Sequence, residues 1–381
     1  MREDEALGFV IDELTRLIEI PSVSDQEHEA MRHLADRCRR LDLPVDEQPV
    51  PGAGPNLVVG WDVAPTLLLT AHIDTIVPMW QTDHRASVDG TIVSGLGAQD
   101  DKGCAVAILL AMLMARDEGV PVERLPVALG FCVDEEVGGK GSRAMADSLR
   151  PPFVIASEGT EFDVAVTETG FVEGWVRIPG RSMHGSLIEE ADNPLLRAAG
   201  LIQDLGRASF TRLEHPIAGR NMVTVLQLLA DQRSNATPEE ARMLISARVF
   251  EEPSLADVAG ELSRLCAEHG AVFDEIDRGG WWETPWEAPL VRTLVGASER
   301  AIGRTPRPTR MPAWTDAHSF HDRSDSEVVV YGPGHLRTAH RPDEHIDAAD
   351  IVRAARVMAG VIGDVGQLQE ARTAMREGDA P

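Results

Sequence analysis

The sequence predicts an α/β fold: a mostly parallel sheet covered by helices on both faces, with an inserted α+β domain of four strands and two helices. Apolar runs of strand length alternate with patterns of helical spacing before about residue 170 and again after about residue 288. The central runs are almost entirely apolar, which is typical of parallel strands buried on both faces. Between these two parts the elements follow an α+β order. We therefore expect one domain built from residues 1–170 and 288–381, interrupted by a second domain over residues 171–287.

The first part of the chain is predicted to alternate between helices and strands. Apolar residues recur at helical spacing over residues 4–19 and 26–41, and Ser24 and Asp25 can cap the second helix. The next elements, in chain order, are strands over Asn56–Gly60 and Thr66–Thr70, a helix over Cys104–Arg116, a strand over Leu125–Val133, a helix over Ser142–Leu149 and a strand over Phe153–Ala156. The strand at Thr66–Thr70 is nearly all apolar, so we expect it at the centre of the sheet.

The middle of the chain is predicted to form the inserted domain. Its expected strands cover Val164–Thr167, Phe171–Ile178, Met222–Leu228 and Ala241–Phe250, and its helices cover Asn193–Arg207 and Leu255–Cys266. Alternation along the last strand places the apolar side chains of Met243, Ile245, Ala247 and Val249 on the face that packs against helices. After the insertion we expect a helix over Leu290–Ile302, a strand over Glu327–Tyr331, a helix over Ala348–Ile362 and about a dozen frayed polar residues at the end.

Composition and charge exclude several classes of partner. With 62 acidic residues and 36 Lys or Arg, the formal charge is 36 − 62 = −26, so nucleic acid and anionic membranes would repel this chain. The longest apolar run, Ala105–Ala115, is too short to span a membrane. The N-terminus lacks the apolar core of a signal peptide, and the four cysteines have no CxxC spacing. We expect a cytoplasmic protein that acts on a small molecule.

Residues able to bind metal ions follow the predicted strands of the α/β part. The segments are Ala71-His72-Ile73-Asp74, the glycine-rich run Gly95–Gly103 with Asp100, Asp134-Glu135-Glu136, Ser157-Glu158-Gly159-Thr160, and Gly332-Pro333-Gly334 leading to His340. In an open parallel sheet, the ligand crevice lies beyond the carboxyl ends of the strands. Five separate segments would therefore bring a His, an Asp, two Glu and a second His to one edge of the sheet.

Each segment alone also has a purely structural explanation. His72 can be a hydrogen-bonded loop residue, Asp100 can favour a helix dipole, and Glu158 can cap local backbone. For the second histidine, His335 and His345 compete with His340. Only the coincidence of all five at equivalent places in the fold favours a shared site.

The chemistry that uses such a set is hydrolysis at two metal ions. One carboxylate bridges two divalent cations about 3.5–4 Å apart, and each cation binds one His and one further carboxylate. Another carboxylate, outside the metal shell, takes a proton from water. The adjacent Glu135 and Glu136 can divide these two tasks, and Asp74 can fix the tautomer of His72.

These segments resemble the M20 metallopeptidase family. The resemblance rests on HIDTIVP at 72–78, GLGAQDDKG at 95–103, DEEVGGKG at 134–141, SEGT at 157–160 and GPG…AH at 332–340, and it runs from about residue 10 to 362. The family includes acetylornithine deacetylases, succinyl-diaminopimelate desuccinylases, aminoacylase-1, carboxypeptidase G2 and carnosinase-like dipeptidases. The chain departs from its usual motifs at Ala71 and Leu96, neither of which is a ligand position.

The resemblance implies a role for each residue of the set. Asp100 would bridge the two ions, with His72 and Glu158 on one ion and Glu136 and His340 on the other. Glu135 would act as general base and then as the acid that protonates the leaving amine. Asp74 would orient His72.

The resemblance also implies a lid and dimerisation role for the inserted domain. His184, in the segment GRSMHGSLIEEADNPL at 180–195, would stabilise the oxyanion of the tetrahedral intermediate. Asn235 and Arg248 would form a clamp for a substrate carboxylate, with the guanidinium as its charged part. The lid would pair with the lid of a second subunit in a homodimer.

The function expected from the resemblance is deacylation of N-acyl amino acids or related small carboxylate-bearing amides, in the presence of two divalent ions. Ligands of N and O type permit Zn²⁺, Co²⁺ or Mn²⁺, and we expect Zn²⁺. The first alternative is a carnosinase-like dipeptidase or carboxypeptidase of the same family. The second is a non-catalytic binding relative, although every ligand position holds a competent residue.

Overall fold

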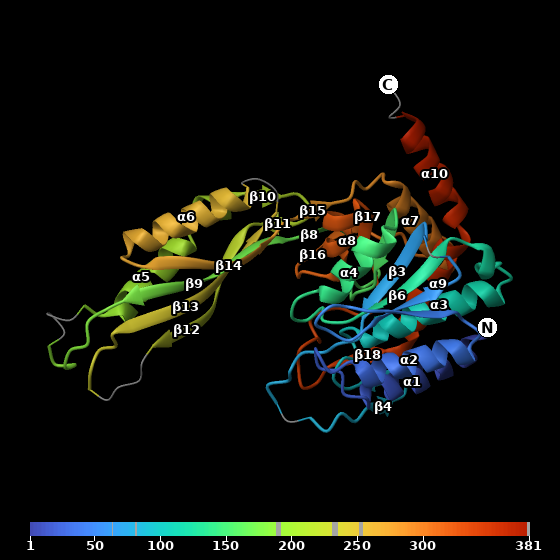
Figure 1. Cartoon of the computed structure of the whole chain (residues 1–381), viewed down its shortest axis with the longest axis horizontal. Coiled ribbons are helices and arrows are strands. Elements are labelled where there is room, and N and C mark those ends of the chain that lie inside the picture. The colour runs from blue at the N-terminus through green and yellow to red at the C-terminus, as the bar shows by residue number, and fades with distance from the viewer. Residues whose placement is uncertain (63, 81, 188–191, 231–234, 251–253, 379–381) are drawn as a thin grey trace. The chain divides into compact units, whose positions relative to one another are not determined.

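The computed structural model describes the chain except for residues 63, 81, 188–191, 231–234, 251–253 and 379–381, and except for the side chains of residues 375–378 (Figure 1). It divides into two compact units. The α/β unit comprises Met1–Val166, Thr284–Met311 and Thr315–Pro381, and the inserted unit comprises Thr167–Glu283 and Pro312–Trp314. Each is described below by itself.

The α/β unit is built on a nine-stranded sheet in the order β1-β2-β6-β3-β7-β17-β8-β15, with β16 paired to β8. The strands are β1 (Val45–Gln48), β2 (Asn56–Gly60), β3 (Leu67–His72), β6 (Val127–Cys132), β7 (Phe153–Ala156), β8 (Val164–Glu168), β15 (Trp282–Glu283), β16 (Pro308–Met311) and β17 (Glu327–Val330). The four central strands β6, β3, β7 and β17 are parallel, and antiparallel strands flank them. The predicted fold class is confirmed.

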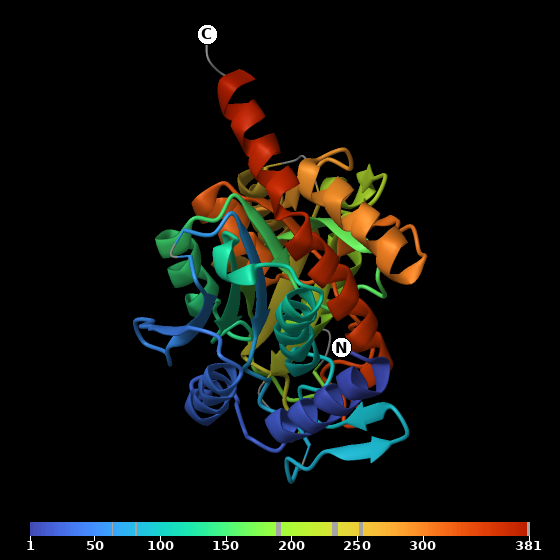
Figure 2. The ribbon, with the colours of Figure 1, turned by 90° about the vertical axis from the view of Figure 1, so that its right-hand side faces the viewer.

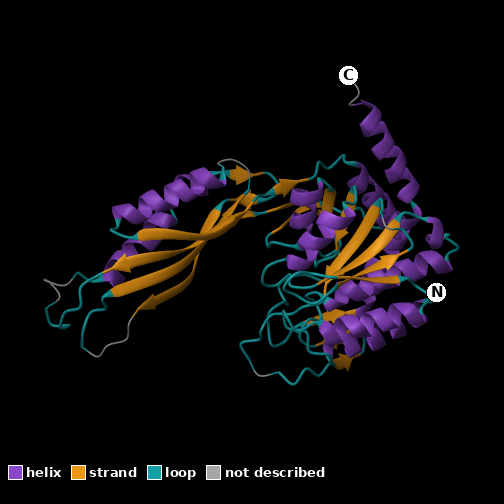
Figure 3. Ribbon diagram, in the orientation of Figure 1, coloured by secondary structure: helices purple, strands orange, loops and turns teal. Residues whose placement is uncertain are grey.

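Helices cover both faces of this sheet and bury its central strands. Every residue of β3, β6 and β7 is buried, as their apolar sequences require. The helices are α1 (Glu3–Ile18), α2 (His28–Arg40), α3 (Lys102–Asp117), α4 (Lys140–Leu149), α7 (Pro289–Ile302), α8 (Asp316–Ser324), α9 (Ala348–Gly363) and α10 (Val365–Gly378). α3 is apolar all round and packs between β3 and α9, whereas α4 and α8 pack together against β6 and β7 (Figures 1 and 3).

A small three-stranded sheet lies beside the main one in the order β18-β5-β4. Its strands are β4 (Ser87–Asp89), β5 (Ile92–Ser94) and β18 (His345–Asp347). β18 pairs with β5 in antiparallel register, His345 opposite Ser94. This pairing brings the C-terminal part of the chain beside the glycine-rich segment that follows β5.

The inserted unit is a four-stranded antiparallel sheet with two helices on one face. Its strand order is β12-β13-β9-β14, formed by β9 (Gly170–Pro179), β12 (Met222–Ala230), β13 (Glu240–Val249) and β14 (Val272–Gly279). The helices α5 (Pro194–Leu205) and α6 (Leu255–Glu268) give it the βαββαβ order of a ferredoxin-like fold. Alternate residues of β13 from Ala241 to Val249 pack against these helices, as the sequence alternation predicts.

Two expectations for the elements are wrong. Val164–Thr167 was expected in the inserted sheet, but β8 pairs with β17 and β15 in the main sheet, and β14 is the fourth inserted strand. β14 has the polar sequence VFDEIDRG and one exposed face, so hydrophobicity does not reveal it. The polar end was expected to fray, but α10 continues to Gly378 because Val365 and Leu368 are buried (Figure 2).

Two further observations concern membrane-spanning helices and cysteines. No helix in the described residues combines the length and apolar character needed to cross a bilayer. All four cysteines are buried free thiols.

Candidate metal centre

The five predicted ligand segments converge at the carboxyl ends of the parallel strands. His72 ends β3, Glu136 follows β6, and Glu158 follows β7. Asp100 precedes α3, and His340 lies on the loop that follows β17. Because parallel strands end at the same edge, these side chains meet although they are far apart in sequence.

Asp100 lies between the two histidines and directs a different oxygen at each. Its Oδ1 is 3.0 Å from Nε2 of His72, and its Oδ2 is 3.2 Å from Nε2 of His340. Nε2 of His340 is also 3.1 Å from Oε2 of Glu136. A carboxylate that bridges two metal ions needs this arrangement, with one oxygen directed toward each histidine.

The remaining predicted residues lie around His72. Nε2 of His72 is 3.6 Å from Oε1 of Glu158 and 3.8 Å from Oε2 of Glu135. Among the three candidate histidines after β17, it is His340 that contacts Asp100 and Glu136. The ring nitrogen Nδ1 of His335 accepts from the backbone of Arg337.

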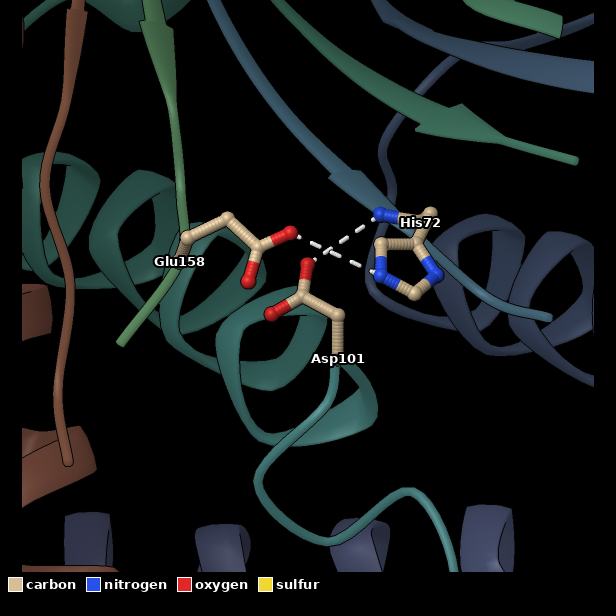
Figure 4. Close-up of side chains that lie close together, drawn as sticks. All are labelled: His72, Asp101 and Glu158. Carbon is tan, nitrogen blue, oxygen red and sulfur yellow. Dashed lines mark hydrogen bonds and ion pairs between the residues drawn. The ribbon is translucent and has the colours of Figure 1, made fainter. Parts of the chain in front are cut away.

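Asp101 is a site residue that the sequence analysis did not assign. It is fully buried, and its Oδ2 accepts a hydrogen bond of 3.2 Å from the backbone N–H of His72. With His72 and Glu158 it forms one group whose geometry could hold a metal ion (Figure 4). Asp100, Glu136 and His340 form a second such group. The adjacent pair Asp100-Asp101 indicates that either aspartate could be a ligand, but the sequence does not show which carboxylate points toward which histidine.

Asp74 contacts more than His72. Its Oδ1 is 3.4 Å from Nδ1 of His72, and its backbone carbonyl is 3.0 Å from the same nitrogen. The same carboxylate accepts hydrogen bonds from the backbone N–H groups of Glu135 at 3.0 Å and Glu136 at 3.1 Å. The expectation that Ser24 or Asp25 caps the second helix is wrong, because α2 begins at His28 after Glu27; Ser24 instead donates its hydroxyl to Asp74 Oδ2 at 2.7 Å.

The charges of the site suit divalent cations. In the described part of the chain, none of its carboxylates pairs with Lys or Arg; they are those of Asp74, Asp100, Asp101, Glu135, Glu136 and Glu158. Oε2 of Glu158 and Oδ1 of Asp101 are buried without a hydrogen-bond partner. Buried carboxylates without compensation are costly, and their oxygens are ligands for divalent ions.

The pKa values reflect this excess of negative charge. Burial raises the pKa of Glu135 well above its usual value. Burial alone would lower the pKa of His72, yet the carboxylates of Glu135 and Asp100 raise it well above normal. Hydrogen bonds to Asp100 and Glu136 raise the pKa of His340 to about 10. Without metal ions, protons must neutralise the site; bound cations would take their place.

The predicted lid residues all lie in the inserted unit, but not together. His184 and Asn235 are neighbours: the N–H of Gly185 donates to the carbonyl of Asn235 at 2.8 Å, and His184 pairs with Ala236. Residues 188–191 of the lid segment lie outside the described residues. Arg248 is at the other end of β13, opposite Phe171 and Met222.

Within one chain, therefore, Asn235 does not lie beside Arg248 as expected. Asn235 precedes the start of β13 at Glu240, and Arg248 lies eight residues further along that strand. At about 3.4 Å per residue in an antiparallel strand, this part of β13 alone spans roughly 27 Å. A sequence motif gives the order of two residues, but an extended strand between them keeps them apart.

Comparison with known proteins identifies the family. The model of Peptidase family M20/M25/M40 matches residues 68–364, which is most of the chain. The chain belongs to this family. It is a metal-dependent hydrolase, as the resemblance of its motifs predicted.

Named relatives and solved structures agree with this family. A probable carboxypeptidase of Emericella nidulans is 26% identical over 373 residues, covering 89% of this chain and 85% of that protein. A putative [LysW]-lysine/[LysW]-ornithine hydrolase of Pyrobaculum aerophilum is 25% identical over 362 residues, covering 94% and 98%. A tripeptidase from Staphylococcus aureus has the same fold, with a TM-score of 0.77, 18% identity, and coverage of 94% of this chain and 98% of that one.

Proposed function

We propose that this family member hydrolyses amide bonds with two divalent metal ions, with Asp100 as the bridging ligand. His72 and Glu158 would be the further ligands of one ion, and Glu136 and His340 would be the further ligands of the other. The observation that carries the proposal is the placement of the two Asp100 oxygens, one toward each histidine, at 3.0 and 3.2 Å. The absence of thiolate from this set is compatible with Zn²⁺, Co²⁺ or Mn²⁺, and Zn²⁺ is our choice.

Glu135 is proposed as the proton carrier. Bound divalent ions would polarise the amide carbonyl and lower the pKa of water. Glu135 lies on the same loop as the ligand Glu136 and is 3.8 Å from Nε2 of His72, so it is beside the ligands. It would take the proton from the attacking water and then give it to the leaving amine. Asp74 would hold the loop that carries both glutamates.

The substrate class is proposed to be an amide whose amine half carries a free carboxylate. N-acyl amino acids are the first candidates, and dipeptides or peptides cut at their C-terminus are the alternative, which the name of the Emericella relative favours. Arg248 supports a carboxylate because its guanidinium forms no ion pair within the described residues and contacts the Phe171 ring at 5.6 Å. A charged hydrogen bond from Arg to a carboxylate is worth roughly 1.5–3 kcal/mol.

His184 is proposed to reach the site of a second copy in a homodimer. Its ring is exposed and bonds only to Ser186 at 2.8 Å among the described residues, so it is free to contact a substrate oxyanion. His184 and Arg248 are separated by most of the length of β13, about 27 Å or more, which exceeds the size of an acylated amino acid. If both contact one substrate, they come from different subunits.

A substrate panel tests this function. The protein would be loaded with Zn²⁺, Co²⁺ or Mn²⁺ and assayed on N-acetyl and N-succinyl amino acids, unblocked dipeptides, and the same compounds with the terminal carboxylate converted to an amide. We expect metal-dependent hydrolysis of one carboxylate series and little hydrolysis of its amides. Preference for dipeptides would select the alternative. No hydrolysis of any series, with full metal occupancy, would favour the non-catalytic relative.

A further inference from the structure

A buried glutamate that the proposed mechanism does not use lies next to Asp100. Glu344 is 2% exposed and lies just before β18. Its Oε1 accepts hydrogen bonds from the backbone N–H of Gln99 at 2.9 Å and of Asp100 at 3.1 Å. Its own carbonyl accepts the N–H of Gly95 at 3.0 Å. The side chain and backbone of Glu344 thus hold both ends of the segment that presents Asp100.

The cost of this arrangement indicates that it has a purpose. Oε2 of Glu344 is buried without a hydrogen-bond partner, and within the described residues the carboxylate forms no ion pair. Burying an unpaired carboxylate is unfavourable unless its hydrogen bonds are needed. The needed bonds here are those to two successive N–H groups, the second of which belongs to Asp100 itself.

Gln99 connects the same segment to the segment that leads to His340. Its Nε2 donates to the carbonyl of Pro333 at 3.2 Å, and its Oε1 accepts from the N–H of His335 at 3.1 Å. A Cβ at position 334 would lie 1.8 Å from Oε1 of Gln99, so any other residue there would displace the Gln99 side chain from these hydrogen bonds. Glu344 follows His340 by four residues. The loop that carries His340 is therefore hydrogen-bonded to the segment that carries Asp100 at two places, through Glu344 and through Gln99.

We propose that Glu344 is a positioning residue for the metal centre. Acting through the backbone N–H groups of Gln99 and Asp100, it fixes the direction of the Asp100 carboxylate and keeps His340 at the spacing that one shared ion requires. This inference rests on the proposed two-metal function. Partners outside the ligand shell typically change metal affinity by about 10- to 100-fold when they are removed.

The experiment compares Glu344→Ala with a matched control on the same segment. Asp347→Ala removes another carboxylate that accepts a backbone N–H, that of Ala349 at 2.9 Å, but this carboxylate caps α9 instead of binding the Asp100 segment. Zn²⁺ affinity and stoichiometry would be measured by competition with a chromogenic chelator, and folding by thermal unfolding of the metal-free proteins. We expect Glu344→Ala to lose about 10- to 100-fold in affinity for at least one ion, while Asp347→Ala lowers Tm and keeps native affinity.

Two conservative variants complete the test. Glu344→Gln keeps an oxygen in place of Oε1 and should recover most of the affinity. Glu344→Asp keeps the charge but shortens the side chain, so its Zn²⁺ affinity should fall. If the alanine variant does not fold, the aspartate variant replaces it in the comparison. Native affinity in both Ala and Asp variants, or equal losses in Glu344→Ala and Asp347→Ala, would overturn the positioning role. A native protein that binds no Zn²⁺ would instead contradict the proposed function.

Discussion

The carboxylate of Asp74 lies closer to the loop of Glu135 and Glu136 than to the ring of His72. Its two oxygens receive the N–H groups of these glutamates at 3.0 and 3.1 Å, whereas Nδ1 of His72 is 3.4 Å from Oδ1. The sequence predicted the contact with His72 from the HxD spacing. It could not predict the contacts with the glutamate loop, since they depend on the path of backbone 61 and 62 residues away.

Asp74→Ala should therefore disturb both the proposed base and a ligand. We expect kcat to fall by about 10- to 100-fold together with Zn²⁺ affinity, a range typical of residues that support metal ligands. Asp74→Asn can accept from only one of the two N–H groups with its single oxygen, so its losses should be intermediate. Steady-state kinetics and metal competition would measure both. Activity within twofold of native for the alanine variant would contradict this role.

Arg248 is predicted to recognise the substrate carboxylate. Arg248→Ala should lower kcat/KM for a carboxylate substrate by about ten- to a hundredfold, in line with one lost charged hydrogen bond. The matching amide should already be poor with the native enzyme and should lose little more. Equal losses for acid and amide would mean that Arg248 only packs against Phe171.

At the scale of elements, the apolar strands and helices were predictable and the loops between them were not. β2 and β7 begin and end at the predicted residues, because a short apolar run bounded by turn residues allows few alternatives. The sequence also placed the five ligand segments at one edge of the sheet. It missed Asp101 and Glu344, since their hydrogen bonds beside the candidate ligands follow from side-chain directions in loops that no periodic pattern describes.

The start of α7 is held by a partly buried glutamate that lies away from the metal centre. Glu327, the first residue of β17, accepts the N–H of Leu290 at 2.6 Å, and burial raises its pKa from 4.5 to about 7. Between these two values the folded chain holds a proton that the unfolded chain has released. The contribution to stability is therefore full below about pH 4.5 and is lost as the pH rises through about 7.

Glu327→Gln should remove this dependence because the amide does not titrate. Relative to the native protein, the free energy of unfolding of the variant should rise by about 2 kcal/mol between roughly pH 5 and pH 8. Urea unfolding of metal-free protein at both pH values gives the difference. A constant difference between the two proteins would mean that Glu327 titrates normally.

For the whole molecule, we expect the proposed homodimer to form through the edge strand β12. Its exposed apolar side chains, Met222, Leu226, Leu228 and Leu229, are exposed to between 41% and 50%. Exposed apolar edge strands promote pairing with another chain. Leu229→Lys should give a monomer in analytical ultracentrifugation, since Leu229 lies opposite Arg242, away from the helix-packed face. The control Ile276→Lys, on the opposite edge strand β14, should stay dimeric; a native monomer would contradict the proposal.

Complementation tests whether His184 acts in the second subunit. His184→Ala and Glu135→Gln would each be inactive alone. After mixing and subunit exchange, half of the dimers should carry one site with both residues native, restoring about a quarter of native activity. No recovery, in mixtures whose exchange is verified, would place His184 in its own subunit.

The most direct test of the two-metal centre is metal content measured beside activity in two variants. After loading and desalting, elemental analysis should find two ions per chain in the native protein and in Glu135→Gln, whose turnover should fall by about 10²–10⁴. Asp100→Ala should lose both ions, because Asp100 is the ligand they share. A native protein holding fewer than one ion per chain, or Glu135→Gln retaining half of native activity, would contradict the account.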